Sequence, residues 1–354
     1  VLNNDTGAAP LSAGPAIIAT TNGGQVSMAA NGSFLYTPAA GFAGPSDTFT
    51  YILTDNGGSS DSAVVTINMS GVVWYVNAQA GGSDGRSHSP FSTMTAAASA
   101  ALAGQTIYVH QGSPTGATAL KANQTLWGAG AAFGLNGLAI AATSAPTLQG
   151  ALTLADGVLL RALAVNGGGS TAIAGTNLTG SETLNGVSIV GGSTGLSLTN
   201  LGGSLAMIGG SIAGVSGTAV SISGGSGSVT VGAAISNTAG RSVEIQNRTG
   251  GIVAFSGGVA DTGTGVLLNS NTGSTISFTG GLAVATDTVD AFIATGGGTV
   301  TATQNNTSIV NTIASTSGQA LRVVDTQGRI RTVAGTGEAG LSGDGGPAAK
   351  AILA

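Results

Sequence analysis

Short runs in which apolar residues alternate with polar or small ones recur along the middle of the chain, about 23 residues apart. Turn-forming Gly, Ser, Thr and Asn separate these runs. One series of equivalent apolar positions is Ile173, Leu196, Val220, Val243 and Val266, and a second is Val229, Val253, Ile276 and Val300. The pattern predicts two short strands in each repeat, and repetition at a fixed period is typical of a solenoid.

The composition of the repeats favours β-coils over helical hairpins. Each run lasts about four residues and is rich in Val, Thr and Gly, whereas an amphipathic helix places apolar residues three and four positions apart. We therefore predict an all-β fold whose main part, residues 105–318, is a parallel β-helix of about nine or ten coils, or about 45 Å at 4.8 Å per coil. The predicted core residues of its less regular first coils are Leu126, Trp127, Leu148, Leu152, Leu154, Leu159 and Leu163.

Residues 1–70 carry longer alternating runs, with hairpin turn signals at Asn31-Gly32 and at Asn56 to Gly58. These features predict a small β-sandwich module. Its predicted core and packing residues are Phe34, Tyr36, Phe42, Phe49, Tyr51 and Leu53.

An Ala-rich stretch within residues 71–104 predicts one short helix before the solenoid. Ser92 or Thr93 is a suitable N-cap, and Gly104 a suitable end. We expect this helix to cover the open first coil, with residues 105–109 (QTIYV) forming the first solenoid strand. Its predicted buried face consists of Met94, Ala97, Ala98, Ala101 and Leu102.

The overall composition limits the classes of function. The 354 residues include no Cys and carry a net charge of −5, and hydrophobic residues make up 42%, which excludes a disordered chain. Nine scattered basic residues argue against binding to nucleic acid. No apolar run reaches the ~18–20 residues of a membrane span. Because the sequence starts at Val1 without a signal pattern, we expect any export signal to lie upstream.

Three segments resemble known families. VLNNDT at the start, NGSFLYTPAAGFAG and SDTFTYILTDNGGSSDSAVVTI resemble the cadherin-like, Ig-like tandem repeats of large bacterial surface proteins. In that family a further strand usually precedes the VLxNDT stretch, so the resemblance implies an unpaired sheet edge here. WYVN, GGSDGRSHSPF and AGQTIYVHQG resemble the start of right-handed, pectate-lyase-like parallel β-helices of bacterial surface proteins. The end of the chain, within residues 319–354, resembles the opening of an NHL-type propeller repeat.

The acidic residues of the first module raise the question of calcium. Asp5, Asp47, Asp55 and Asp61, with neighbouring amides, are weak calcium candidates, because this ion binds six to eight oxygens. Turn formation is the favoured explanation for these residues, since no DxDxDG loop is present. We predict no other cofactor.

Three asparagines follow inward positions of successive repeats by four residues. Asn177, Asn200 and Asn247 predict a stacked amide ladder that satisfies corner backbone groups. The equivalent positions 224 and 270 hold Gly and Ser, so the ladder is interrupted.

The solenoid shows no pattern typical of an active site. Its acidic residues do not recur in register, although Asp287 and Asp290 share one loop. Glu244 is expected to face outward with Arg241 and Arg248 in a surface cluster. His88 is expected to fold against the cap, and no nucleophile elbow, phosphate loop or HExxH motif is present. We therefore predict that the chain is not an enzyme.

These observations favour a structural protein of the bacterial cell surface, namely a fibre subunit, stalk or adhesin. The predicted partner is another copy of the chain, joined head to tail when the C-terminal tail extends into the first module of the next copy. The predicted self-association residues are Arg329, Ile330, Arg331, Thr332 and Val333. The alternative is a carbohydrate-binding or carbohydrate-cleaving β-helix that contacts a surface glycan or host surface through Arg241, Glu244 and Arg248.

Overall fold

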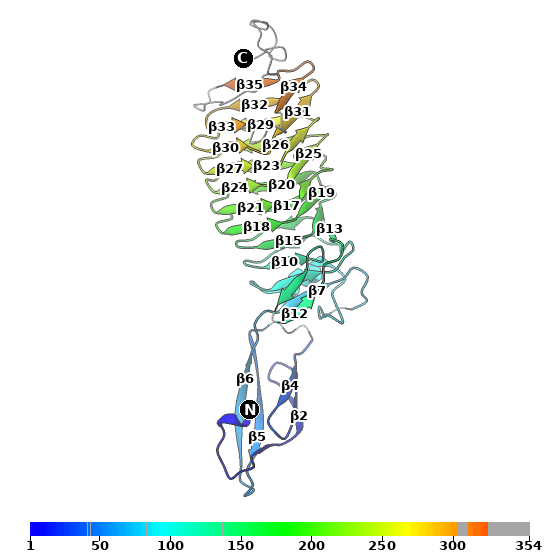
Figure 1. Cartoon of the computed structure of the whole chain (residues 1–354), viewed down its shortest axis with the longest axis vertical. Coiled ribbons are helices and arrows are strands. Elements are labelled where there is room, and N and C mark those ends of the chain that lie inside the picture. The colour runs from blue at the N-terminus through cyan, green and yellow to red at the C-terminus, as the bar shows by residue number, and fades with distance from the viewer. Residues whose placement is uncertain (41, 43, 83, 136, 303–310, 325–354) are drawn as a thin grey trace.

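The computed structural model describes residues 1–40, 42, 44–82, 84–135, 137–302 and 311–324. Figure 1 shows an elongated molecule with a small β-module at one end and a long stack of coils reaching the other. The all-β fold with one helix, a small N-terminal module and a parallel solenoid agrees with the sequence prediction.

The N-terminal module consists of two antiparallel three-stranded sheets, β1-β5-β6 and β2-β3-β4. Both predicted turns join neighbouring strands, and Gly32 and Gly58 adopt the positive φ angles that these hairpins require. Its elements are η1 (Leu2–Asn4), β1 (Ser12–Ala13), β2 (Ala16–Ala19), β3 (Gln25–Met28), β4 (Phe34–Thr37), β5 (Ser46–Thr54) and β6 (Ser60–Asn68).

The core of this module is small. Its buried apolar residues are Ala13, Val26, Met28, Phe49 and Tyr51. Of the predicted core residues, Phe49 and Tyr51 are buried, whereas Tyr36, Phe42 and Leu53 are half-buried. Phe34 is 38% exposed and packs edge-on against Phe49 from the rim.

The segment that leads into the solenoid contains β7 (Val73–Val76), α1 (Met94–Ala100) and β8 (Thr106–Val109). Thr93 caps α1, because its hydroxyl oxygen accepts the backbone N–H of Ala96 at 3.3 Å. Met94, Ala97 and Ala101 belong to the solenoid core, so α1 covers the first coil.

Two predictions for this segment were wrong. Leu102 is 46% exposed, because α1 ends at Ala100 and Leu102 leaves the helical face. The first solenoid strand is β7, which pairs in parallel with β8 and precedes the predicted first strand.

Three parallel sheets form the solenoid (Figure 1). The ten-stranded sheet contains β7, β8, β10 (Thr125–Gly128), β15 (Leu159–Arg161), β18 (Ser181–Asn185), β21 (Ser204–Ile208), β24 (Ser228–Val231), β27 (Ile252–Phe255), β30 (Thr275–Phe278) and β33 (Thr299–Ala302). The nine-stranded sheet contains β9 (Thr118–Ala119), β14 (Leu152–Thr153), β17 (Thr171–Thr176), β20 (Thr194–Thr199), β23 (Val220–Ser223), β26 (Arg241–Gln246), β29 (Gly265–Asn269), β32 (Phe292–Thr295) and β35 (Leu321–Val324).

The eight-stranded sheet contains β13 (Thr147–Gln149), β16 (Ala164–Asn166), β19 (Ser188–Gly191), β22 (Ser211–Ile212), β25 (Ala234–Asn237), β28 (Val259–Asp261), β31 (Leu282–Thr286) and β34 (Thr312–Ser315). A separate hairpin, β11 (Phe133–Leu135) and β12 (Leu138–Ile140), forms its own two-stranded sheet.

The strand registers confirm the sequence repeat. Ile173 pairs with Leu196 and Leu196 with Val220, and the second series pairs in the same way through Val229 and Val253. Each coil, however, has three strands and not the predicted two, because the short strands of the eight-stranded sheet were missed. From β17 to β34 the described chain forms six consecutive three-strand coils. The ten- and nine-stranded sheets reach the predicted nine or ten layers, whereas the third sheet has eight strands in the described part of the chain.

Every second side chain of the solenoid strands points inward and joins one continuous apolar core. The predicted residues Leu126, Leu148, Leu152, Leu154 and Leu163 are buried in this core.

Two residues of the first coils were wrongly assigned to the core. Leu160, and not Leu159, is the inward residue of β15. Trp127 lies on the outer face, where the guanidinium carbon of Arg161 is 4.5 Å from its ring centroid.

Candidate functional site

One long strand of the N-terminal module has a free edge. β6 pairs with β5 along nine residues, and no other strand in the described part of the chain pairs with it. Its inward residues Ala63, Val65 and Ile67 are only half-buried, although they pack against the core. Val64, on the outer face, is 68% exposed. The module therefore leaves both backbone groups and apolar surface open at this edge.

Asp47 is the polar centre of the same module and is 1% exposed. Its carboxylate accepts hydrogen bonds from the hydroxyls of Thr20 and Tyr36 and from the backbone N–H groups of Asn22 and Thr48. Burial alone would raise the pKa of Asp47, but these four bonds lower it below its usual value. Burial and the bond to Asp47 raise the pKa of Tyr36 to about 12.

The other calcium candidates lie in different surroundings and do not share hydrogen-bond donors. Asp5 accepts the hydroxyl of Tyr51 at 2.5 Å, and this bond, with burial, raises the pKa of Tyr51 to about 12. Asp55 accepts the backbone N–H of Ser59 at 2.9 Å, and Asp61 is exposed. Among the described residues, no three acidic or histidine side chains come together as a metal site. In the described structure, Asp5, Asp47 and Asp55 thus accept hydrogen bonds from residues of strands and turns.

The charged side chains of the first module all have the same sign. Residues 1–70 contain four Asp and no Lys, Arg or His. The charged side chains of this module are therefore all negative.

The other end of the molecule finishes, in its described part, at β35. Arg322, Val323 and Val324 of this strand are exposed. The predicted self-association residues Arg329, Ile330, Arg331, Thr332 and Val333 lie outside the described residues.

The three predicted ladder residues lie at equivalent corners of the solenoid. Asn177, Asn200 and Asn247 have φ angles of 54°, 53° and 57°, and Gly224 and Ser270 share this left-handed conformation. Asn tolerates such angles better than most residues do, which explains its recurrence. The backbone N–H of each Asn donates to a carbonyl of the next coil. Their exposed side chains form no hydrogen bond with other described residues, so the corner is satisfied by backbone alone.

Arg248 lies inside the solenoid and not in the predicted surface cluster, with 1% of its surface exposed. Its guanidinium donates to the carbonyls of Gly224, Gly227 and Gly250. The equivalent position one coil earlier is Gly225. The Nε atom has no described partner, and burial lowers the pKa of Arg248. Sequence reasoning missed this residue because two of its hydrogen-bond acceptors, the carbonyls of Gly224 and Gly227, lie in the preceding coil.

Arg241 and Glu244 remain on the outer face as a half-exposed pair, with Nε and Oε2 3.9 Å apart. Gln246 also donates to Glu244. Without Arg248, the surface predicted to contact a glycan or host surface is reduced to a nearly neutral pair.

Two solenoid carboxylates meet at a corner. Asp156 accepts the backbone N–H and the hydroxyl of Thr179 at 2.7 and 2.9 Å, and these bonds lower its pKa. Glu182 points inward and is 1% exposed. Its Oε1 accepts the N–H of Gly157 at 3.1 Å, while its Oε2 is buried without a described partner. Burial raises the pKa of Glu182, and the charge of Asp156 adds to the effect.

The remaining candidates for chemistry are also structural or exposed. Asp261 accepts three backbone N–H groups at 2.6 to 3.0 Å. Asp290 accepts the N–H of Gln319 at 2.9 Å, whereas Asp287 bonds through its backbone carbonyl. His88 is exposed.

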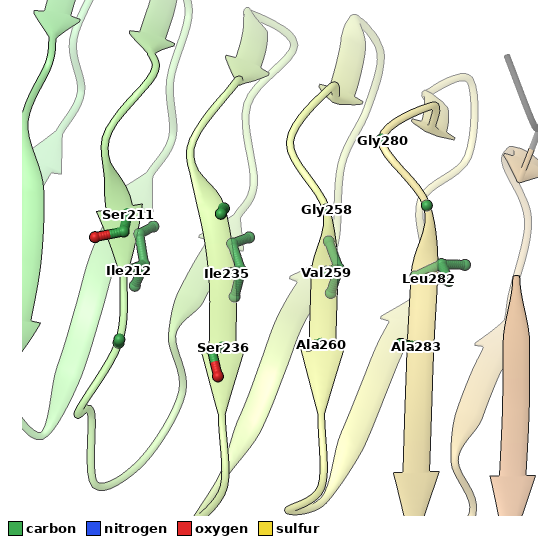
Figure 2. Close-up of a pocket in the computed structure, with 13 residues that line it drawn as sticks. Ser211, Ile212, Ile235, Ser236, Gly258, Val259, Ala260, Gly280, Leu282 and Ala283 are labelled. Carbon is green, nitrogen blue, oxygen red and sulfur yellow. The ribbon is translucent and has the colours of Figure 1, made fainter. Parts of the chain in front are cut away.

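A shallow groove of about 420 Å³ crosses β22, β25, β28 and β31. Figure 2 shows Ile212, Ile235, Val259 and Leu282 at corresponding positions of these four strands. Small exposed residues such as Ala260 and the hydroxyl of Ser236 complete the lining. The groove contains no charged side chain, so it offers shape and backbone contacts and no acid or base.

The geometry defines a class of protein: a parallel β-solenoid preceded by a small antiparallel β-module. Residues 1–68 match the family model of the bacterial Ig domain, which agrees with the predicted Ig-like module. Neither the curated proteins nor the solved structures contained a match to the chain. No helix in the described part of the chain is long and apolar enough to cross a membrane.

Proposed function

We propose that this chain is a non-enzymatic structural subunit of an extracellular bacterial fibre, stalk or adhesin, and that its copies join head to tail. The observation that carries this proposal is the free edge of β6 at one end of a rod (Figure 1). An unpaired strand edge is a template for another chain, and a contact between unlike ends that does not close produces a filament.

The structure of the rod supports a mechanical role. Its apolar core is continuous from α1 to the last coils, and each coil pairs with its neighbours through backbone hydrogen bonds. The buried carboxylates of Glu182 and Asp261 and the partly exposed carboxylate of Asp156 accept backbone N–H groups. These side chains thus stabilise corners of the solenoid.

The bacterial Ig match and the solenoid fit a surface or adhesin-like protein. The resemblances to cadherin-like repeats and to pectate-lyase-like β-helices remain predictions that support the same location. The NHL-like resemblance of the tail falls on residues 325–354, which lie outside the described part.

Glycan binding is the second candidate function, and the groove of Figure 2 favours it over the Arg241 surface. A groove without charge suits a neutral, extended saccharide, because desolvation of a charged ligand would not be repaid there. Binding of neutral glycans on an array, and its loss in Ala260→Arg, would support this candidate. The matched control is Ala206→Arg on the ten-stranded sheet, outside the groove.

Assembly is tested by analytical ultracentrifugation and negative-stain electron microscopy of the purified 354-residue chain. We expect filaments one molecule wide that lengthen with protein concentration. A sedimentation profile that stays monomeric at all concentrations contradicts head-to-tail assembly.

A further inference from the structure

We propose that the free edge of β6 receives residues 329–333 of a second copy of this chain as an added strand. This inference rests on the proposed head-to-tail assembly and names the surface and segment that carry it. The occupant is a strand from another copy, because the charge, the length and the starting point of the C-terminal segment all favour it.

The acceptor surface is defined by β6 itself. Its nine residues present one side to β5 and leave the other side without a described strand. On β5, Phe49 and Tyr51 are buried, but Val65 and Ala63 opposite them are half-buried. A strand added beside β6 pairs the open backbone groups and covers this apolar row.

The donor segment has the matching alternation. Ile330 and Thr332 share one face of an extended strand, whereas Arg329 and Arg331 share the other. The face that carries Ile330 and Thr332 can cover the half-buried apolar row of β6. The two arginines suit a module with four Asp and no basic residue.

The reach of the chain excludes pairing within one copy. Residue 333 is nine residues beyond Val324, the end of β35, so an extended chain spans about 30 Å between them. The ten-stranded sheet between β33 and β7 has nine steps of about 4.8 Å, or about 43 Å in all. The module lies beyond β7 (Figure 1), so residues 329–333 cannot reach β6 of their own copy.

The orientation of β6 also fits a head-to-tail contact between two copies of the chain. In Figure 1, β6 runs along the long axis of the molecule, whereas the solenoid strands run across it. A donor strand that pairs with β6 therefore runs along the long axis of the acceptor copy. Direct pairing of β35 with β6 would instead place the long axes of the two copies across each other.

The test uses engineered disulfides, because the chain contains no Cys. Val64→Cys is introduced in one copy, and Arg331→Cys or Val333→Cys in another, so that a disulfide forms only between copies. Val64 is already exposed, which limits any effect on folding. The matched control is Ile17→Cys, which is 71% exposed on the other sheet of the module. We expect at least tenfold more linked dimer with Val64→Cys than with Ile17→Cys.

A second variant disrupts the donor. Ile330→Pro removes a backbone N–H within the added strand and should raise the critical concentration for assembly at least tenfold. Thr336→Pro, outside the segment, should leave it unchanged. The charge reversal of Arg329 and Arg331 to Asp should weaken assembly, because the module carries only acidic charged side chains.

The outcomes separate this inference from the proposed function. Absence of assembly in the unsubstituted chain overturns both. Filaments that form normally with Ile330→Pro and give no Val64-specific disulfide overturn the inference alone, and show that another segment, including any that precedes Val1, occupies the β6 edge.

Discussion

The two parts of this molecule bury β-strands in different ways. In the solenoid, each coil covers the next and α1 closes the first, so the apolar core is continuous along the rod. In the N-terminal module, five buried residues form the core, and the residues of β6 beside it stay half-buried. The solenoid therefore gains stability from the number of its coils, whereas the module is left open along one strand.

The two parts also differ in how they bury polar groups. Asp47 of the module has four donors, and neither of its oxygens is left without a partner. In the solenoid, Glu182 and Arg248 each keep one buried polar atom without a described partner. The solenoid tolerates the free-energy cost of these unpaired buried atoms because its repeated apolar core is large. The module, in contrast, depends on the single hydrogen-bond network around Asp47.

The largest expected effect concerns the inward row of the solenoid. Leu160→Ala should lower the free energy of unfolding by about 3 kcal/mol, because it creates a cavity in the core. Leu159→Ala, on the outer face of β15, should cost less than about 1 kcal/mol. Urea unfolding followed by tryptophan fluorescence reports on the solenoid, since both tryptophans, Trp74 and Trp127, lie in its strands. Equal losses for the two variants would refute the inward orientation of Leu160.

The next effect concerns the module alone. Asp47→Ala should destabilise it by about 2–3 kcal/mol, because the hydroxyls of Thr20 and Tyr36 lose their acceptor. Calorimetry should show a lower transition for the module and an unchanged one for the solenoid. Asp61→Ala, at an exposed site, is the control and should change neither.

The same carboxylate predicts how the module responds to acid. The folded-state pKa of Asp47 is lowered, so its contribution is present above the unfolded-state pKa and is lost as pH falls through the folded-state pKa. The module should therefore melt at lower temperature at pH 3 than at pH 7. This shift should become smaller in Asp47→Ala but should not vanish, because the backbone N–H groups of Ser59 and Ala8 also lower the pKa of Asp55. A shift of undiminished size would contradict the role of Asp47.

A smaller effect is expected for the buried cation of the rod. Arg248→Met should cost about 2 kcal/mol, because the carbonyls of Gly224, Gly227 and Gly250 lose their donor. Arg241→Met, on the half-exposed surface, should cost less than about 0.5 kcal/mol. Chemical unfolding of the two variants provides the comparison, and a stabilised Arg248→Met would contradict the assigned hydrogen bonds.

The smallest effect has the opposite sign. Burial raises the folded-state pKa of Glu182, so its favourable contribution is complete below the unfolded-state pKa and is lost as pH rises through the folded-state pKa. Glu182→Gln should stabilise the solenoid by about 1 kcal/mol at pH 8 and leave it unchanged at pH 4. Melting temperatures of both proteins across this range test the prediction, and a pH-independent difference would exclude titration of Glu182.

The sequence allowed the repeat to be predicted because inward residues such as Leu196 and Val220 recur at nearly constant spacing and pair in the structure. The third strand of each coil escaped prediction, since β22 has two residues and too few alternations to define a period. Leu159 and Leu160 are adjacent leucines, so local pattern cannot decide which one points inward. The inward orientation of Glu182 could have been predicted from the sequence, because this residue lies two positions before buried Leu184 on the same face of β18.

The candidate interface was only partly predictable. The resemblance to Ig-like repeats indicated an open edge, but the half-burial of Val65 and Ile67 became visible only in the folded module. The buried position of Arg248 depends on the carbonyls of Gly224 and Gly227 in the preceding coil, which are 24 and 21 residues away in the sequence. Contacts between coils of this kind are set by stacking and cannot be inferred from one repeat.

Amide hydrogen exchange of β6 before and after assembly tests the open edge most directly. In the monomer, we expect the amides of residues 60–68 that face away from β5 to exchange rapidly, and in filaments we expect them to become protected. The inner solenoid strands should stay protected in both states. Protection of all β6 amides in the monomer, equal to that of β5, would contradict the account.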